Sequence, residues 1–137
     1  MTLNKKQIEE QFKYWEITAE HDWEIAQFLW HSKKYDACLF YCHLTIEKYL
    51  KGLVVLETGK IAPFIHDLEE LARKSGIVPA DSDLRKLGEF TYFNVACRYV
   101  DFKKSFWKLC NKTYSEPYFK EAKKIIIWLK KSYLEKK

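Results

Sequence analysis

The sequence predicts an all-α protein, an up-and-down antiparallel bundle of four to five helices. Apolar residues recur at three- and four-residue steps over long stretches, which is the period of an amphipathic helix. Only four Gly and three Pro interrupt the 137 residues, so we expect long helices with short connections. No stretch alternates apolar and polar residues as a half-buried strand does. A chain of this length forms one domain, which we place over residues 1–137.

Two long helices are predicted in the N-terminal half of the chain. The first spans about residues 5–31, and its apolar stripe consists of Ile8, Phe12, Trp15, Ala19, Trp23, Ala26 and Trp30. The second spans about residues 35–58, and its inner face consists of Leu39, Cys42, Ile46, Leu50 and Leu53. Gly59 is placed to end this second helix, because glycine readily adopts the left-handed conformation found after helix C-termini.

Shorter elements follow in the C-terminal half. "HDLEELARKSG" predicts a short helix closed by Gly76, and a fourth helix is expected over about 82–99, with Asp81 or Ser82 as its N-cap. The expected apolar side of that helix consists of Leu84, Leu87, Thr91 and Val95. Residues 101–117 either continue it past a kink or form a long connection. Pro117 then fits the first turn of a last helix. The stripe of that helix consists of Phe119, Ala122, Ile126, Leu129 and Tyr133.

Composition and charge narrow the class of protein. Apolar residues make up 47% and charged residues 31%, as in globular domains. No apolar run approaches the roughly 18 residues of a membrane span, and "MTLNKKQIEEQF" is too polar for a signal peptide, so we expect a cytoplasmic protein that is not membrane-bound. Residues 1–102 carry 13 basic and 16 acidic side chains, whereas residues 103–137 carry 11 lysines and three glutamates. This basic third either attracts nucleic acid or forms a solvated helix face.

Two further patterns concern metals and assembly. The four cysteines lack zinc-finger spacing, and although Cys38 and Cys42 could clamp a metal at i and i+4, we interpret them as small buried hydrophobes and predict no metal site. The run "IIIWL", residues 125–129, is apolar around more of its helix than one core face requires. It therefore predicts a helix–helix contact between two copies, and so a homodimer.

Three groups of polar residues are candidates for a site. Glu47 and Lys51 form an i, i+4 pair that is either ordinary helix electrostatics, worth a few tenths of a kcal/mol on a solvated face, or the edge of a site. His66 lies at a predicted helix N-terminus, where it either caps and packs or contacts a phosphate. Arg98, on an apolar helix, needs a carboxylate such as Asp101 or Glu47, or an anionic ligand.

The stretch "ACLFYCHLTIEKYLKGLVVLETGKIAPFIHDLEELA", followed by "VACRYVDF", resembles the HEPN domain, the "higher eukaryotes and prokaryotes nucleotide-binding" family. The matching features are Ala37, Glu47-Lys48 with Lys51, His66-Asp67-Leu68, and Arg98-Tyr99 with Asp101. The resemblance implies a helical bundle, commonly a homodimer with a cleft between its subunits. It also implies a minimal nucleotidyltransferase partner, because HEPN proteins are often encoded beside one in two-gene prokaryotic toxin–antitoxin modules.

The same resemblance implies a ligand-binding edge for a nucleotide such as ATP, or for RNA. Its residues are Arg98, Tyr99, Asp101, Glu47, Lys48, Lys51 and His66. In this interpretation Arg98 and Lys48 or Lys51 contact phosphates. A base stacks on an aromatic side chain, for which Tyr92, Phe93 and Tyr99 are the candidates, although a stripe of aromatics is also typical of a core.

Catalysis is where the chain departs from part of the family. Some HEPN proteins are metal-independent ribonucleases that carry an Arg, four to six intervening residues and then a His. After Arg98, the corresponding positions are Lys103, Lys104 and Ser105, none of which replaces imidazole as a general base. We therefore predict a non-catalytic module that binds a nucleotide, RNA or a partner. The alternatives are a divergent ribonuclease toxin that uses Arg98 with His66 or His43, and a helical assembly scaffold.

Overall fold

The structure, a computed structural model, describes residues 2–77 and 81–137, except for the side chains of residues 81, 82 and 100–103. The described residues form six helices and no strand: α1 (Lys5–His31), α2 (Tyr35–Thr58), α3 (Leu68–Lys74), α4 (Asp81–Arg98), α5 (Val100–Leu109) and α6 (Lys112–Lys136). The predicted all-α class is confirmed. The helices number six, because the ambiguous segment 101–117 contributes a helix of its own.

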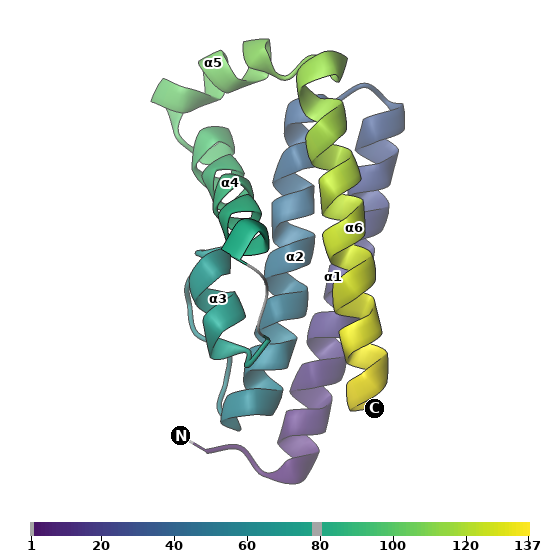
Figure 1. The fold of residues 1–137 in the computed structure, drawn as a ribbon, viewed down its shortest axis with the longest axis vertical. Coiled ribbons are helices and arrows are strands. Elements are labelled where there is room, and N and C mark those ends of the chain that lie inside the picture. Colours follow the sequence, from purple (N-terminus) through teal and green to yellow (C-terminus); the bar gives the residue numbers. More distant parts are fainter. Residues whose placement is uncertain (1, 78–80) are drawn as a thin grey trace.

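Helix α2 lies at the centre of the bundle. The long helices alternate in direction, with α1 and α6 on one side of α2 and α3 and α4 on the other (Figure 1). α5 crosses the end of the bundle between the end of α4 and the start of α6 (Figure 1). Because α2 packs against all five other helices, its faces decide what each neighbour contacts.

The two N-terminal helices match the predicted bounds and stripes closely. Asn4 and Gln7 form a capping box at the start of α1, with the Asn4 side chain accepting from the Gln7 amide at 2.8 Å. α2 ends at Gly59, whose φ of 68° is left-handed and whose amide donates to the Val55 carbonyl at 2.9 Å. All five predicted inner residues of α2, namely Leu39, Cys42, Ile46, Leu50 and Leu53, are buried.

The core face of α4 differs from the predicted one. Leu87 is buried as expected, but Phe90, Phe93 and Ala96 fill the core, whereas Leu84, Thr91 and Val95 are only half-buried. The reason is the cluster of rings beneath α5 and α6, where Phe93 lies 5.4 Å from Phe106 and 5.1 Å from Tyr118 between ring centroids. Phe93 is therefore a core residue and is not accessible for stacking a base.

The last helix begins earlier than predicted. α4 stops at Arg98, and Tyr99 takes an extended backbone conformation before α5. The Asn111 side chain then accepts from the Tyr114 amide at 2.8 Å, which caps α6 at its start. Pro117 consequently lies in the second turn of α6, and its placement in the first turn was wrong. The predicted N-caps of α4, Asp81 and Ser82, have side chains outside the described residues.

The apolar run near the end of α6 is mostly internal. Ile125, Ile126 and Leu129 are buried and Trp128 is half-buried, whereas Ile127 is 61% exposed. One side chain of the run therefore faces outward from a single chain, and the homodimer remains a prediction. Within the described ranges, no helix combines the length and the apolarity needed to cross a lipid bilayer.

Candidate functional site

One face of α2 carries a stripe of aromatic, titratable and charged side chains. Phe40, His43, Glu47 and Lys51 follow one another at three- or four-residue steps, so they lie above one another on the same side of the helix. His43, Glu47 and Lys51 are all buried, which is unusual for charged and titratable groups. The pair Glu47–Lys51 is therefore not on a solvated face, and each of its charges requires a partner.

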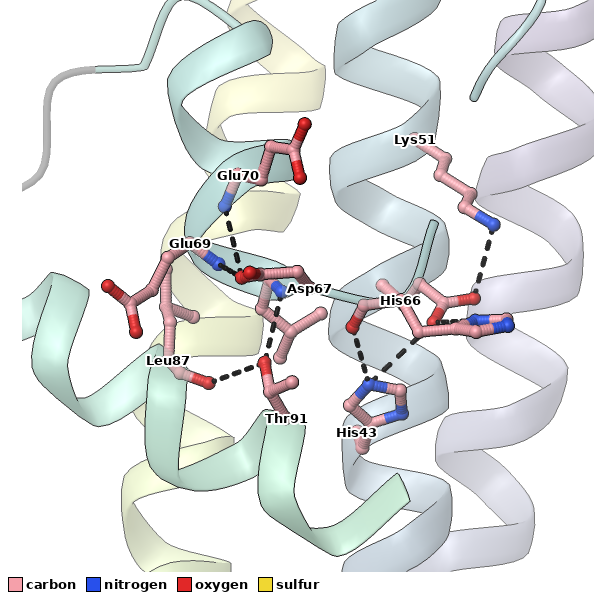
Figure 2. A network of polar contacts seen from close by, with 10 residues as sticks. His43, Lys51, His66, Asp67, Glu69, Glu70, Leu87 and Thr91 are labelled. Carbon is pink, nitrogen blue, oxygen red and sulfur yellow. Dashed lines mark hydrogen bonds and ion pairs between the residues drawn. The ribbon is translucent and has the colours of Figure 1, made fainter. Parts of the chain in front are cut away.

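The Glu47 carboxylate is the centre of this stripe. One of its oxygens, Oε1, accepts a hydrogen bond from Nδ1 of His66 at 2.8 Å and lies 3.6 Å from Nε2 of His43. Its other oxygen, Oε2, pairs with Nζ of Lys51 at 3.3 Å. Figure 2 shows Lys51, His43 and His66 converging on this point. The Lys51 ammonium also lies over the Trp15 ring, 5.6 Å from its centroid, so α1 completes its surroundings.

His66 reaches this cluster from the loop between α2 and α3. Its carbonyl accepts from Nε2 of His43 at 3.1 Å, which fixes the backbone of the loop to α2. Its side chain is 47% exposed although Nδ1 is held by a buried carboxylate. Because Nδ1 faces Glu47, the ring is oriented, and Nε2 has no protein partner among the described residues. The site therefore presents one imidazole nitrogen in a defined direction.

Two further contacts fix the end of the loop between α2 and α3, one to the start of α3 and one to α4. Asp67, rather than His66, caps α3, with its Oδ1 accepting from the amides of Glu69 at 3.0 Å and Glu70 at 3.2 Å. The Leu68 amide donates to the hydroxyl of Thr91 on α4 at 3.0 Å (Figure 2). Sequence reasoning placed Thr91 in an apolar stripe and missed this role. Thr91 is the only residue with a hydroxyl in that predicted stripe, and this feature could have indicated a hydrogen-bonding role.

His43 is a positioning residue whose imidazole is enclosed. Nε2 donates to the His66 carbonyl, whereas Nδ1 is buried and has no hydrogen-bond partner among the described groups. Burial lowers the pKa of His43 below its ordinary value, and the positive charge of Arg98 acts in the same direction. The Glu47 carboxylate opposes this shift of the pKa without cancelling it. A neutral ring with its proton on Nε2 is the form that fits these contacts.

This lowered pKa predicts that acidification destabilises the protein. The unfolded chain takes up a proton at His43 near pH 6.5, whereas the folded chain does so only at lower pH. The free energy of unfolding should therefore fall as pH drops below about 6.5, by at most about 1.4 kcal/mol per pH unit from this one group. Urea titrations from pH 8 to pH 5 would measure it.

The matched variant for this prediction is His43→Gln, whose amide can still donate to the His66 carbonyl but does not titrate. Its free energy of unfolding should depend less steeply on pH than that of the parent. Equal slopes for the two proteins would show that other groups cause the acid sensitivity.

Lys48 does not join the cluster, although it was grouped with these residues from the sequence. Its Nζ lies 2.6 Å from Oδ2 of Asp22, a buried carboxylate on α1. Lys48 and Lys51 are three residues apart, but they pair with different carboxylates on different neighbours. The structure thus brings together Glu47, Lys51 and His66, and it directs Lys48 to the interface between α1 and α2.

Arg98 lies at the other end of the same stripe. Its side chain is exposed, and its guanidinium lies over the Phe40 ring, 5.5 Å from the centroid. Among the described side chains, none forms an ion pair with Arg98. The side chain of Asp101, its predicted partner, lies outside the described residues. Because Phe40 lies on the same face of α2 as His43 and Glu47, this contact places Arg98 on the same side of α2 as the cluster. Phe40 and Glu47 are seven residues apart, about 10 Å along the helix.

The arrangement offers positive charge and hydrogen-bond donors at Arg98 and one oriented imidazole nitrogen at His66. The guanidinium of Arg98 provides a planar set of N–H donors, and its stacking on Phe40 limits how it can move. His66 provides an oriented nitrogen, and exposed Tyr99 follows Arg98 directly in the chain. Within the described ranges, no group of three or more His, Cys, Asp or Glu side chains is placed to hold a metal ion. Such an edge suits a ligand that carries phosphates.

Comparison with known proteins gives one finding. A family model described as the HEPN domain matches residues 12–133, from the third turn of α1 to the last turn of α6. No curated protein and no solved structure matches the chain significantly. The match includes all of the residues described above, from Trp15 to Arg98.

Proposed function

The chain belongs to the HEPN domain family, and from this premise we propose that it is a non-catalytic module that binds a phosphate-bearing ligand, a nucleotide or an RNA. We further propose that it acts with a minimal nucleotidyltransferase in a toxin–antitoxin-like system. The single observation that carries the binding proposal is the stripe of α2, where a buried carboxylate orients His66 at one end and Phe40 supports Arg98 at the other.

The electrostatics of the stripe favour an anion. The negative charge of Glu47 is already engaged by Lys51 at 3.3 Å and by His66 at 2.8 Å, so it presents little free charge to a ligand. The charge of Arg98, by contrast, is not neutralised by any described side chain. A phosphate oxygen is a better acceptor for a guanidinium than a neutral group, because charge-assisted hydrogen bonds are shorter and stronger.

The binding proposal is tested by titration calorimetry with ATP, GTP and a short RNA. Arg98→Ala should weaken binding by roughly 10- to 150-fold, the equivalent of one hydrogen-bonded charge contact. Arg85→Ala is the matched control, because Arg85 is an exposed arginine of the same helix, 13 residues and about 20 Å away. Equal losses in the two variants would mean that only net charge matters, and no binding to any of the three probes would overturn the proposal.

The nucleotidyltransferase partner rests on family membership, and the homodimer rests also on the outward-facing Ile127. Co-expression with the product of a neighbouring nucleotidyltransferase gene, followed by purification through a tag on one protein, tests the first. Sedimentation of the parent and of Ile127→Lys tests the second, because a buried lysine would break an α6 contact between copies. A monomer that does not depend on concentration would contradict the homodimer.

A divergent ribonuclease is the second candidate, and one contact favours it. The His66–Glu47 pair at 2.8 Å has the arrangement of a carboxylate–histidine dyad, in which the carboxylate orients the ring and leaves its other nitrogen available as a base. RNA cleavage by the purified protein that is lost in His66→Ala would replace the non-catalytic proposal. His43 is a weaker candidate for this base, because its ring is enclosed.

A further inference from the structure

Helix α5 presents a second surface that the stripe of α2 does not include. Lys104, Trp107 and Lys108 lie at i, i+3 and i+4, so they share one side of the helix. All three are exposed, and the indole of Trp107 is 63% exposed. A tryptophan so accessible to water, between two lysines, contributes nothing to the described core.

The opposite side of α5 is anchored firmly. Phe106 is buried, with its ring centroid 5.4 Å from that of Phe93 and 6.2 Å from that of Tyr92. Because this contact fixes the rotation of α5, Trp107 is held on the outside by the packing of its neighbour in the chain. The exposure of Trp107 therefore follows from the direction in which Phe106 packs.

The charge of this segment restricts its partner. Between Asp101 and Glu116 the chain has four lysines, at positions 103, 104, 108 and 112, and no acidic residue. An apolar contact between protein copies favours aromatics but is depleted of lysine at its core. A surface that combines lysines with an exposed indole is instead complementary to a polyanion that also carries flat rings.

We propose that the outer side of α5 binds single-stranded RNA, with Trp107 stacking on an unpaired base and Lys104 and Lys108 contacting the flanking phosphates. The proposal rests on the proposed function, because it extends the same ligand from Arg98 across the junction at Tyr99, which is 60% exposed. Figure 1 shows α5 lying across the end of the bundle at which α4, and so Arg98, terminates.

The chemistry selects single strands over duplexes and over mononucleotides. A base in a duplex is stacked on both faces and cannot also stack on Trp107, whereas every unpaired base offers a face to an aromatic ring. A mononucleotide such as ATP has a single base and no flanking sugar–phosphate backbone, so when it is bound at Arg98 it has no second nucleotide to place on Trp107 between Lys104 and Lys108. Contacts with several phosphates also make the affinity strongly dependent on salt.

The test compares binding of one fluorescent 12-nucleotide RNA, its duplex and ATP by anisotropy and calorimetry. Trp107→Ala should weaken binding of the single strand by roughly 5- to 150-fold, while Trp107→Phe retains most of the affinity. Binding of ATP should not change in either variant. Phe28→Ala, which removes an exposed aromatic of α1, is the matched control and should leave all affinities unchanged. Lys104→Ala with Lys108→Ala should reduce the dependence of affinity on salt.

Different results overturn different proposals. RNA binding that depends on Arg98 but is unaffected by Trp107→Ala refutes the α5 surface and leaves the proposed function standing. Equal affinity for the duplex and the single strand also refutes it. Loss of dimerisation in Trp107→Ala, measured by sedimentation, with unchanged RNA affinity would show that α5 contacts a second copy. Absence of any nucleotide or RNA binding overturns both proposals.

Discussion

Replacing Glu47 by alanine should lower the free energy of unfolding by about 3–5 kcal/mol, the cost of leaving a buried charge without its partner. The Lys51 ammonium is buried and pairs with Glu47 at 3.3 Å, and the Trp15 ring offers it only a weak substitute. The same change releases His66, whose Nδ1 loses its acceptor. Urea or thermal unfolding measures the stability, and calorimetry measures the accompanying loss of ligand affinity.

The double variant Glu47→Gln with Lys51→Met removes both charges and keeps the approximate volume of the two side chains. Removing both members of a buried ion pair costs far less than removing one, because no unpaired charge remains. We therefore expect the double variant to recover most of the stability, with a methionine of similar length lying against Trp15. If Glu47→Ala and the double variant are equally unstable, the unpaired charge of Lys51 is not what destabilises Glu47→Ala.

Replacing Gly52 by alanine should also be strongly destabilising, although alanine is the better helix former by about 1 kcal/mol. Gly52 lies in α2 where Tyr133 of α6 crosses it, and an added Cβ would overlap the Tyr133 hydroxyl and lie 3.1 Å from Cβ of Trp15. Tyr133 is fully buried, donates to the Tyr49 carbonyl at 2.9 Å and stacks on Phe12 at 4.2 Å between centroids. Displacing it should cost a net 1–3 kcal/mol or more, roughly the range for overpacked cores.

The control variant for this prediction is Tyr133→Phe. Alone, it should cost about 0.5–1.5 kcal/mol through the lost hydrogen bond. Combined with Gly52→Ala, it should cost less than the sum of the two changes, because the overlapping hydroxyl is gone. Chemical denaturation of the four proteins completes the cycle. A Gly52→Ala protein as stable as the parent would show that α6 shifts freely, which its packing on α2 argues against.

The two N-terminal helices followed closely from the sequence. α1 and α2 have the predicted bounds, because both helices carry sustained apolar stripes and are bounded by local signals, the cap at Asn4 and the left-handed Gly59. The prediction of the buried face failed for α4, where residues of other helices decide which side chains are buried. The core face of α4 was misplaced because rings from α5 and α6 select Phe90 and Phe93, and a single-helix pattern contains no information about those rings.

The same distinction applies to the polar residues. The i, i+4 spacing of Glu47 and Lys51 fixed their pairing, since neighbours on one helix face meet wherever the helix is placed. The divergent partners of Lys48 and Lys51 could not be foreseen, because they depend on which side of α2 faces α1. Likewise, the family resemblance grouped His66 with Glu47, but only folding of the intervening loop brings Nδ1 within 2.8 Å of the carboxylate.

The sequence by itself therefore determined the all-α class, the bounds of α1 and α2 and the pairing of Glu47 with Lys51, because these depend on periodicity and on neighbours within one helix. The ordered motifs along the chain identified the family. The tertiary structure alone decided which charges are buried, which aromatics are core and which remain exposed. Phe93 and Trp107 illustrate the reason: both are aromatic residues near the junction of α4 and α5, yet one is enclosed and the other is 63% exposed. That difference arises from the side of α5 that faces the core, which the contact between Phe106 and Phe93 fixes, and this is a property of packing between helices.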